Sequence, residues 1–183
     1  MERTILKLKA IEATAESFAE YGQVIEATDD GAEFGGEDAQ LDLSNGIPRL
    51  YILHIENRPF EFSKITHHAR VTQCLGSVDR EAWYLGVAKA SIVEEEEEMN
   101  GGGRSFRSGG GHLYVAPNVE EIRAFRISGA KFVKLNKGTW HAGPLFKASA
   151  RDFYNLELTD TNIVDHTCYS FGEEDGVLFH IED

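Results

Sequence analysis

The feature that most constrains the fold of this chain is a long series of short apolar segments. These segments are rich in β-branched and aromatic residues and are separated by turn residues. Residues 49–56, Arg-Leu-Tyr-Ile-Leu-His-Ile-Glu, are typical of a β-strand. The other segments predicted to form strands are residues 5–11, 24–25, 60–65, 71–75, 82–93, 112–116, 125–127, 131–135, 153–158, 169–171 and 177–181. Many short strands separated by turns are typical of a β-sandwich or a β-barrel. The sequence therefore predicts an all-β fold in a single domain, residues 1–183.

Helices are expected to be few and short. Residues 14–21 carry apolar side chains at helical spacing, and Gly22 is a suitable residue to end a helix there. Asn118 and Glu121 have the spacing of an N-terminal capping pair. Residues 28–46 are polar, acidic and glycine-bearing, and we predict a loop there. Two or three short helices are expected in all.

The chain is acidic, because 18 Lys and Arg stand against 31 Asp and Glu and give a net charge of −13. Such a surface repels phosphate groups, so neither nucleic acid nor an anionic membrane is an expected partner. The sequence has no run of 18 apolar residues, and its first residues do not resemble a secretory signal. Cys74 and Cys168 are isolated and form no CxxC pair, which favours a reducing, cytoplasmic location.

Residues 94–111 differ in composition from the rest of the chain. Five consecutive glutamates, Glu94 to Glu98, are followed by two runs of three glycines. Like charges repel one another, and glycine loses the most conformational entropy when it is ordered. We therefore predict that this segment is a mobile loop that joins two strands.

The first candidate site segment reads Thr-His-His-Ala-Arg-Val-Thr-Gln and ends at Gln73. On a regular strand His67 and His68 point to opposite faces, so only one of them can face a pocket. Gln73 lies an odd number of residues after His68. A bulge or turn at Ala69 or Arg70 is therefore needed to bring both side chains to one pocket.

The second candidate segment reads Asn-Lys-Gly-Thr-Trp-His-Ala-Gly-Pro-Leu-Phe and contains His141. Gly138 allows a sharp turn before the histidine, and Trp140 can form an aromatic wall beside it. Further along the chain, alternation places Asn155 and Glu157 on the same face of a predicted strand. Either face of that strand can contribute a polar group to the interior of a barrel.

Two histidines remote in sequence, His68 and His141, can serve two kinds of chemistry. Near neutral pH they can act as a general acid and base, because imidazole titrates there. They can also ligate a divalent metal as neutral imidazoles, with Gln73 as a further ligand. A site of two histidines and one carboxylate usually contains His-x-Asp/Glu, and the residues after His68 do not match that pattern. The residues by themselves leave both alternatives open.

Taken in order, these segments resemble the ureidoglycolate lyase family of the cupin superfamily. The elements that carry the resemblance are Phe18 to Glu26, His68 with Thr72 and Gln73, Gly138 to His141, Pro144-Leu145-Phe146, Asp152-Phe153 and Asp165. The resemblance runs from about Leu6 to Phe171. The chain departs from the family pattern at Ala142, where the family has a second histidine after the Trp-His pair.

The resemblance implies a cupin-type antiparallel β-barrel and a homodimer. It also implies a lyase that acts on a carbon–nitrogen bond and releases urea and glyoxylate from ureidoglycolate, with no cofactor required. His68 and His141 are the expected acid and base. The expected substrate-binding residues are Gln73 and Asn155 for the ureido group, Arg70 for the carboxylate and Trp140 for the pocket wall.

Two other functions stay open on the sequence. One is a metal-dependent cupin enzyme of different specificity, with a divalent metal held by His68, Gln73 and His141. The other is a non-catalytic paralogue that binds a small molecule, which Ala142 favours. In all three cases the expected partner is a small molecule.

Overall fold

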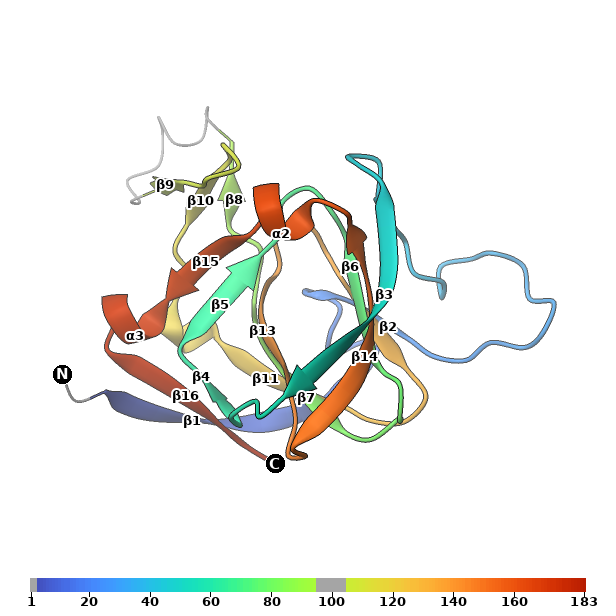
Figure 1. Cartoon of the computed structure of the whole chain (residues 1–183), viewed down its shortest axis with the longest axis horizontal. Coiled ribbons are helices and arrows are strands. Elements are labelled where there is room, and N and C mark those ends of the chain that lie inside the picture. Colours follow the sequence, from blue (N-terminus) through green and yellow to red (C-terminus); the bar gives the residue numbers. More distant parts are fainter. Residues whose placement is uncertain (1–2, 95–104) are drawn as a thin grey trace.

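The structure is a computed structural model that describes residues 3–94 and 105–183 (Figure 1). Its strands are β1 (Thr4–Glu12), β2 (Gly22–Ile25), β3 (Pro48–Glu56), β4 (Glu61–Phe62), β5 (Lys64–His67), β6 (Gln73–Ser77), β7 (Trp83–Ala88), β8 (Ile92–Val93), β9 (Ser105–Arg107), β10 (Leu113–Val115), β11 (Arg123–Ile127), β12 (Phe132–Leu135), β13 (Trp140–Leu145), β14 (Ala150–Leu158), β15 (Thr167–Ser170) and β16 (Val177–Glu182). Its helical elements are the 3₁₀ turn η1 (Val119–Glu121) and the α-helices α2 (Thr161–Val164) and α3 (Phe171–Glu174). In the described ranges, no helix has the length and apolar character needed to cross a membrane.

The strands form two main sheets that curl toward each other (Figure 1). The larger, eight-stranded sheet has the order β15-β5-β13-β7-β11-β1-β16-β4, and the five-stranded sheet has the order β2-β12-β6-β14-β3. A small sheet of order β8-β10-β9 stands at one side. This arrangement confirms the predicted all-β, barrel-like fold with only short helices.

The core lies between the two main sheets. Val133 and Phe153 of the five-stranded sheet belong to the same apolar cluster as Trp83 and Leu85 of the larger sheet. The intervening Tyr84 belongs to a second apolar cluster, so β7 is buried on both of its faces. β13 pairs with this central strand and β5 pairs with β13, which places both candidate histidine segments beside the core.

The larger sheet is mixed rather than wholly antiparallel, because β1 pairs in parallel with both β11 and β16. The first and last strands of the chain therefore lie side by side, as Figure 1 shows. Parallel neighbours need a long connection instead of a hairpin. The alternation of residues along a strand does not reveal which distant strand pairs with it, so this arrangement could not be predicted from the sequence pattern.

One of the two expected helical segments forms a helical turn and the other does not. Residues 14–21 make successive turns, in which the N–H of Phe18 donates to the backbone oxygen of Thr14, but no regular helix. Its backbone hydrogen bonds alternate between partners three and four residues back, as at Ala19 to Glu16 and Phe18 to Thr14, so no continuous α-helical ladder forms. Asn118 does cap η1, because its side chain accepts a backbone N–H of that turn. Phe171, expected in a strand, begins α3 instead.

The predicted mobile loop, residues 94–111, is only partly described. Residues 95–104 lie outside the described residues, so the mobility of that part stays a prediction. The prediction is wrong for residues 105–107, which form β9 and pair with β10. Packing explains this strand, since the ring of Phe106 stacks on that of Tyr114 with the centroids 5.7 Å apart.

Candidate functional site

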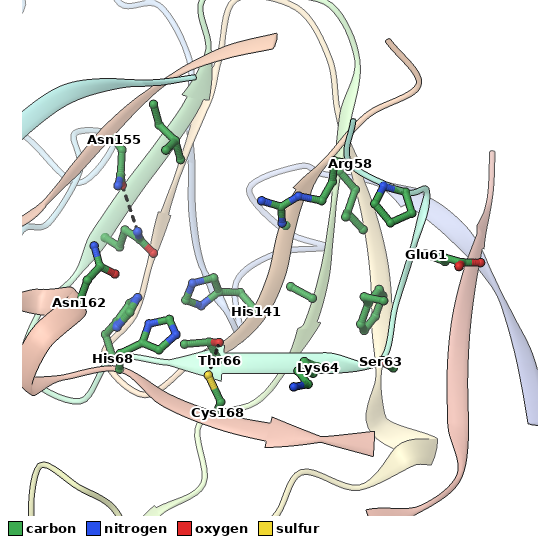
Figure 2. A pocket seen from close by; sticks show the side chains of 18 of the residues that line it. Arg58, Glu61, Ser63, Lys64, Thr66, His68, His141, Asn155, Asn162 and Cys168 are labelled. Atoms are coloured by element: carbon green, nitrogen blue, oxygen red, sulfur yellow. Dashed lines mark hydrogen bonds between the residues drawn. The ribbon is translucent and has the colours of Figure 1, made fainter. Parts of the chain in front are cut away.

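A cavity of about 620 Å³ opens between β3, β5, β6, β13 and β14 (Figure 2). His68 and His141 both line it, and the centroids of their rings lie 5.2 Å apart. A third imidazole, that of His166, lines the same cavity with its ring centroid 5.7 Å from that of His68. The fold therefore brings together the two histidines on which the sequence analysis focused.

His68 faces the cavity because the chain bends directly after β5 ends. Asp165 holds this bend, since its carboxylate oxygens accept the backbone N–H groups of Ala69 and Arg70, both at 2.8 Å. The backbone oxygen of Asp165 also lies 2.6 Å from Nδ1 of His68. The bend supplies the departure from a regular strand that His68 and Gln73 need in order to line one cavity.

His141 lies on β13, shortly after the turn expected at Gly138. Gly138 adopts a φ of 79°, which glycine accepts without strain. Its N–H donates to the backbone oxygen of His68 at 2.7 Å, so the turn links the two histidine segments. Nδ1 of His141 lies 3.2 Å from the backbone oxygen of Thr139.

These contacts fix the tautomers of both rings. A backbone carbonyl oxygen can only accept a hydrogen bond, so Nδ1 carries the proton in His68 and in His141. Nε2 of each ring keeps its lone pair and makes no hydrogen bond to the residues described. Burial lowers the pKa of His68, and burial together with neighbouring His68 lowers the pKa of His141 to about 3. Both imidazoles are therefore neutral at pH 7.

One wall of the cavity is a network centred on Glu157, whose side chain is buried. Its Oε1 accepts the hydroxyl of Tyr51 at 3.1 Å and Nδ2 of Asn162 at 3.0 Å. Its Oε2 accepts Nε2 of Gln73 at 3.3 Å and Nδ2 of Asn155 at 3.2 Å. Burial raises the pKa of Tyr51, so its hydroxyl keeps the proton that it donates. These donors replace the water that a buried carboxylate loses.

Arg3, Arg58 and Lys64 line another part of the cavity, where Glu61 also lies, so cationic side chains outnumber acidic ones there. In the view of Figure 2, Arg58 and Lys64 lie on the opposite side of His141 from Asn155. The side chain of Arg58 extends toward the imidazoles in this view. The cavity thus has a wall rich in amides, a pair of neutral imidazoles and a cationic side.

Two of the expected substrate-binding residues lie elsewhere. The guanidinium of Arg70 donates to the backbone oxygen of Asn45 at 2.9 Å and lies 3.6 Å from the carboxylate of Asp160, so it points away from the cavity. Trp140 is fully buried on the other face of β13, where its Nε1 donates to Ser91 at 2.8 Å. Side chains alternate between the two faces of a strand, so Trp140 faces away from the cavity when His141 faces into it.

A second pair of imidazoles, which we call the outer histidine cluster, consists of His67 and His112. Their Nε2 atoms lie 2.6 Å apart, and Nδ1 of His112 lies 2.8 Å from the hydroxyl of Ser108. The ring of His67 packs against Trp140 and Tyr114, with centroid distances of 4.1 Å and 5.5 Å. Burial lowers the pKa of His67 to about 3. Neither histidine of this cluster lines the cavity.

The cavity residues that the sequence analysis missed include Tyr51, Arg58, Asn162 and His166, along with Arg3 and Lys64. All of them lie outside the two candidate segments, and a tyrosine in a strand or an arginine in a loop carries no local signal of its role. Glu157 did carry a signal, because alternation placed it on the same face as Asn155. Both side chains are buried on the inner face of β14.

The donor set of the cavity does not fit a metal site. Among the residues that the structure describes, no three His, Cys, Asp or Glu side chains are arranged to hold a metal ion. The oxygens of Glu157 each accept two hydrogen bonds already. The set of His68, Gln73 and His141 therefore has no free carboxylate beside it to balance a divalent cation.

A scan against protein-family models finds no match to the chain, and a search of curated proteins finds none either. Function is therefore inferred from the cavity and from the residues that line it.

Proposed function

We propose that the chain is a ureidoglycolate lyase-like enzyme of the cupin type, which releases urea and glyoxylate from ureidoglycolate. One observation carries this proposal: the neutral imidazoles of His68 and His141 adjoin both amide and cationic groups in one cavity. The substrate joins a ureido group, a hydroxyl-bearing carbon and a carboxylate. Amides suit the first, imidazoles the hydroxyl and cations the carboxylate.

In this proposal His68 is the base. Its Nε2 accepts the hydroxyl proton of the substrate while the carbon–nitrogen bond breaks and the carbonyl group of glyoxylate forms. The imidazolium then returns this proton to the departing nitrogen, which leaves as part of urea, so the reaction gains and loses no proton. The backbone oxygen of Asp165 keeps the proton on Nδ1 and stabilises the imidazolium.

His141 has a different role from the one expected. With a pKa of about 3 it stays neutral at pH 7 and cannot serve as the general acid. Its unprotonated Nε2 accepts a hydrogen bond from the substrate and orients it beside His68. The proposed acid is therefore the imidazolium of His68 itself, formed in the first step.

Arg58 takes the role expected of Arg70. A guanidinium binds a carboxylate through two parallel hydrogen bonds, and Lys64 adds a second positive charge to the same cavity. Local cations matter because the net charge of −13 repels an anionic substrate. No cofactor is required by this mechanism.

We also propose that the enzyme is a homodimer. Leu50, Ile52 and Tyr154 are 71%, 57% and 50% exposed on the outer face of the five-stranded sheet, and β3 is the edge strand of that sheet within the described residues. A second copy of the chain would cover both the edge and the apolar face. Sedimentation should show a dimer that Leu50→Asp dissociates, and a wild-type monomer would contradict this part of the proposal.

A second candidate is a binding protein without turnover. Ala142 favours it, because this residue lines the cavity where the family has a histidine. Such a protein would hold the same ligand in the same place, without cleaving it.

The test is the incubation of purified protein with ureidoglycolate, with glyoxylate followed as its phenylhydrazone and urea by an ammonia-releasing assay. We expect equal amounts of both products, and loss of activity in His68→Asn. The matched control is His54→Asn, since His54 is exposed and bonds to Asp152 away from the cavity. Binding of ureidoglycolate without glyoxylate release would favour the second candidate, and absence of both would overturn both.

A further inference from the structure

Glu157 fixes the orientation of the amide groups around it. A carboxylate accepts hydrogen bonds and donates none, so an amide bonded to it turns its NH₂ group toward it. Nε2 of Gln73 lies 3.3 Å and Nδ2 of Asn162 lies 3.0 Å from the Glu157 oxygens. An amide group has nearly the same shape after a half turn, so its shape does not show which atom is the nitrogen and which the oxygen. The hydrogen bonds to Glu157 decide this orientation.

This orientation leaves two amide oxygens for a ligand. Oε1 of Gln73 is buried and has no hydrogen-bond partner in the described part of the chain, although Gln73 lines the cavity. Oδ1 of Asn162 likewise makes no hydrogen bond to a described residue, and Figure 2 shows this side chain on the same side of the cavity as His68. A buried acceptor without a partner costs about 1–3 kcal/mol, so a ligand that supplies a donor to Oε1 of Gln73 is favoured. Asn162 is exposed, and its oxygen offers a second acceptor without that cost.

Asn155 lies in the same network but has nothing left to offer. Its Oδ1 accepts Nε2 of Gln73 at 3.0 Å, and its Nδ2 donates to Tyr51 at 2.9 Å and to Glu157 at 3.2 Å. Asn155 therefore supports Gln73 and does not touch the ligand.

We infer that Gln73 and Asn162 form a pair of acceptors that selects the terminal NH₂ of a carbamoyl or ureido group, with Glu157 as the positioning residue. This inference rests on the proposed function, because it takes the same cavity as the substrate site. An NH₂ group brings two donors to two oxygens. A methyl group leaves both oxygens unpaired, and a carboxylate meets them with a third and fourth acceptor.

The charge of the network favours a neutral group at this place over a cationic one. Arg49 lies with its guanidinium nitrogen 3.8 Å from Oε1 of Glu157 and stacks over the ring of Tyr51. The carboxylate thus has a positive partner already. A ureido group needs no further charge compensation, whereas a guanidinium would place a second cation beside the first.

Two small ligands test this selection directly. Ureidoacetate keeps the carboxylate and the ureido group and lacks the hydroxyl, so it cannot undergo the proposed cleavage. N-acetylglycine differs from it only by a methyl group in place of the NH₂. In calorimetry, the wild-type protein should bind ureidoacetate about tenfold more tightly than N-acetylglycine. Equal affinities, or no binding of either ligand, would overturn the inference.

Variants separate the roles within the network. Glu157→Gln allows Gln73 and Asn162 to turn either way, so the affinity ratio should fall toward one. Asn162→Ala removes one of the two oxygens from an exposed residue, and the ratio should fall there even if Glu157→Gln fails to fold. Asn118→Ala is the matched control, because it makes the same change at an exposed residue that caps η1 away from the cavity, and the ratio should persist. A ratio that stays unchanged in Asn162→Ala contradicts the inference.

The outcomes also separate this inference from the proposed function. Preference for ureidoacetate without release of glyoxylate from ureidoglycolate would leave the acceptor pair standing and overturn the lyase. Release of glyoxylate with no preference between the two ligands would do the reverse.

Discussion

The two pairs of imidazoles lie on opposite faces of β5 and differ in what surrounds them, although His67 and His68 are both buried. His67 is enclosed by Trp140, Tyr114 and its partner in the outer histidine cluster. His68 faces a cavity, with its Nε2 unpaired toward a ligand. Burial lowers the pKa of both side chains, so a lowered pKa by itself does not distinguish them. Nδ1 of His67 also has no hydrogen-bond partner among the described residues, so a free nitrogen does not distinguish the pairs either. The distinction is the cavity, which His68 lines and His67 does not.

Catalysis should separate the two faces most strongly. His68→Ala should lower turnover of ureidoglycolate by roughly 10²-fold or more, because it removes the base, while His67→Ala should retain turnover. Steady-state kinetics with glyoxylate detection measure both variants, with circular dichroism as the check on folding. A His67→Ala variant as inactive as His68→Ala, yet fully folded, would erase the functional difference between the pairs.

The free energy of unfolding should show the opposite order, with the larger loss in the His67 variant. His67→Ala should reduce the free energy of unfolding by about 2 kcal/mol, because it leaves a void among packed aromatic rings. His68→Ala should cost less, because its side chain already borders empty space. Urea denaturation of both variants gives the comparison, and a larger loss in His68→Ala would show that the cavity pair is the structural one.

Acid should weaken the fold through one histidine of each pair. His67 and His141 have a pKa of about 3 in the folded protein, against an ordinary value of 6.5. Between these values the unfolded chain binds more protons, so stability is present above pH 6.5 and falls as the pH drops. The expected slope is about 1.4 kcal/mol per pH unit for each histidine.

Denaturation midpoints at several pH values between about 6 and about 4 measure that slope. His67→Phe should reduce it by the share of one histidine, because the replacement has no proton to bind. An unchanged slope in this variant would mean that His67 is charged in the folded protein.

A smaller effect, on the KM, should distinguish Arg58, which lines the cavity, from Arg70, which lies outside it. Arg58→Ala should raise the KM for ureidoglycolate by about tenfold with little change in kcat, because the guanidinium binds the carboxylate in both ground and transition states. Arg70→Ala should leave KM unchanged, since Arg70 bonds to Asn45 outside the cavity. The reverse result would restore the assignment of the carboxylate to Arg70.

Local sequence patterns predicted much of the fold and part of the site. Strand composition and turn residues predicted the all-β class, because they describe each segment on its own. Alternation placed Asn155 and Glu157 together on one face, and the same rule put only one of His67 and His68 toward a pocket. These predictions succeed because the direction of a side chain on a strand depends on its immediate neighbours.

Tertiary structure decided the rest. Asp165, 97 residues after His68, holds the bend that turns this histidine into the cavity, and the same bend leaves Arg70 outside. The parallel pairing of β1 with β16 and the presence of Arg58 and His141 in one cavity likewise depend on contacts between remote segments. Such contacts arise from the packing of whole sheets against one another. A sequence read one segment at a time therefore contains the candidate groups, and the fold selects which of them meet.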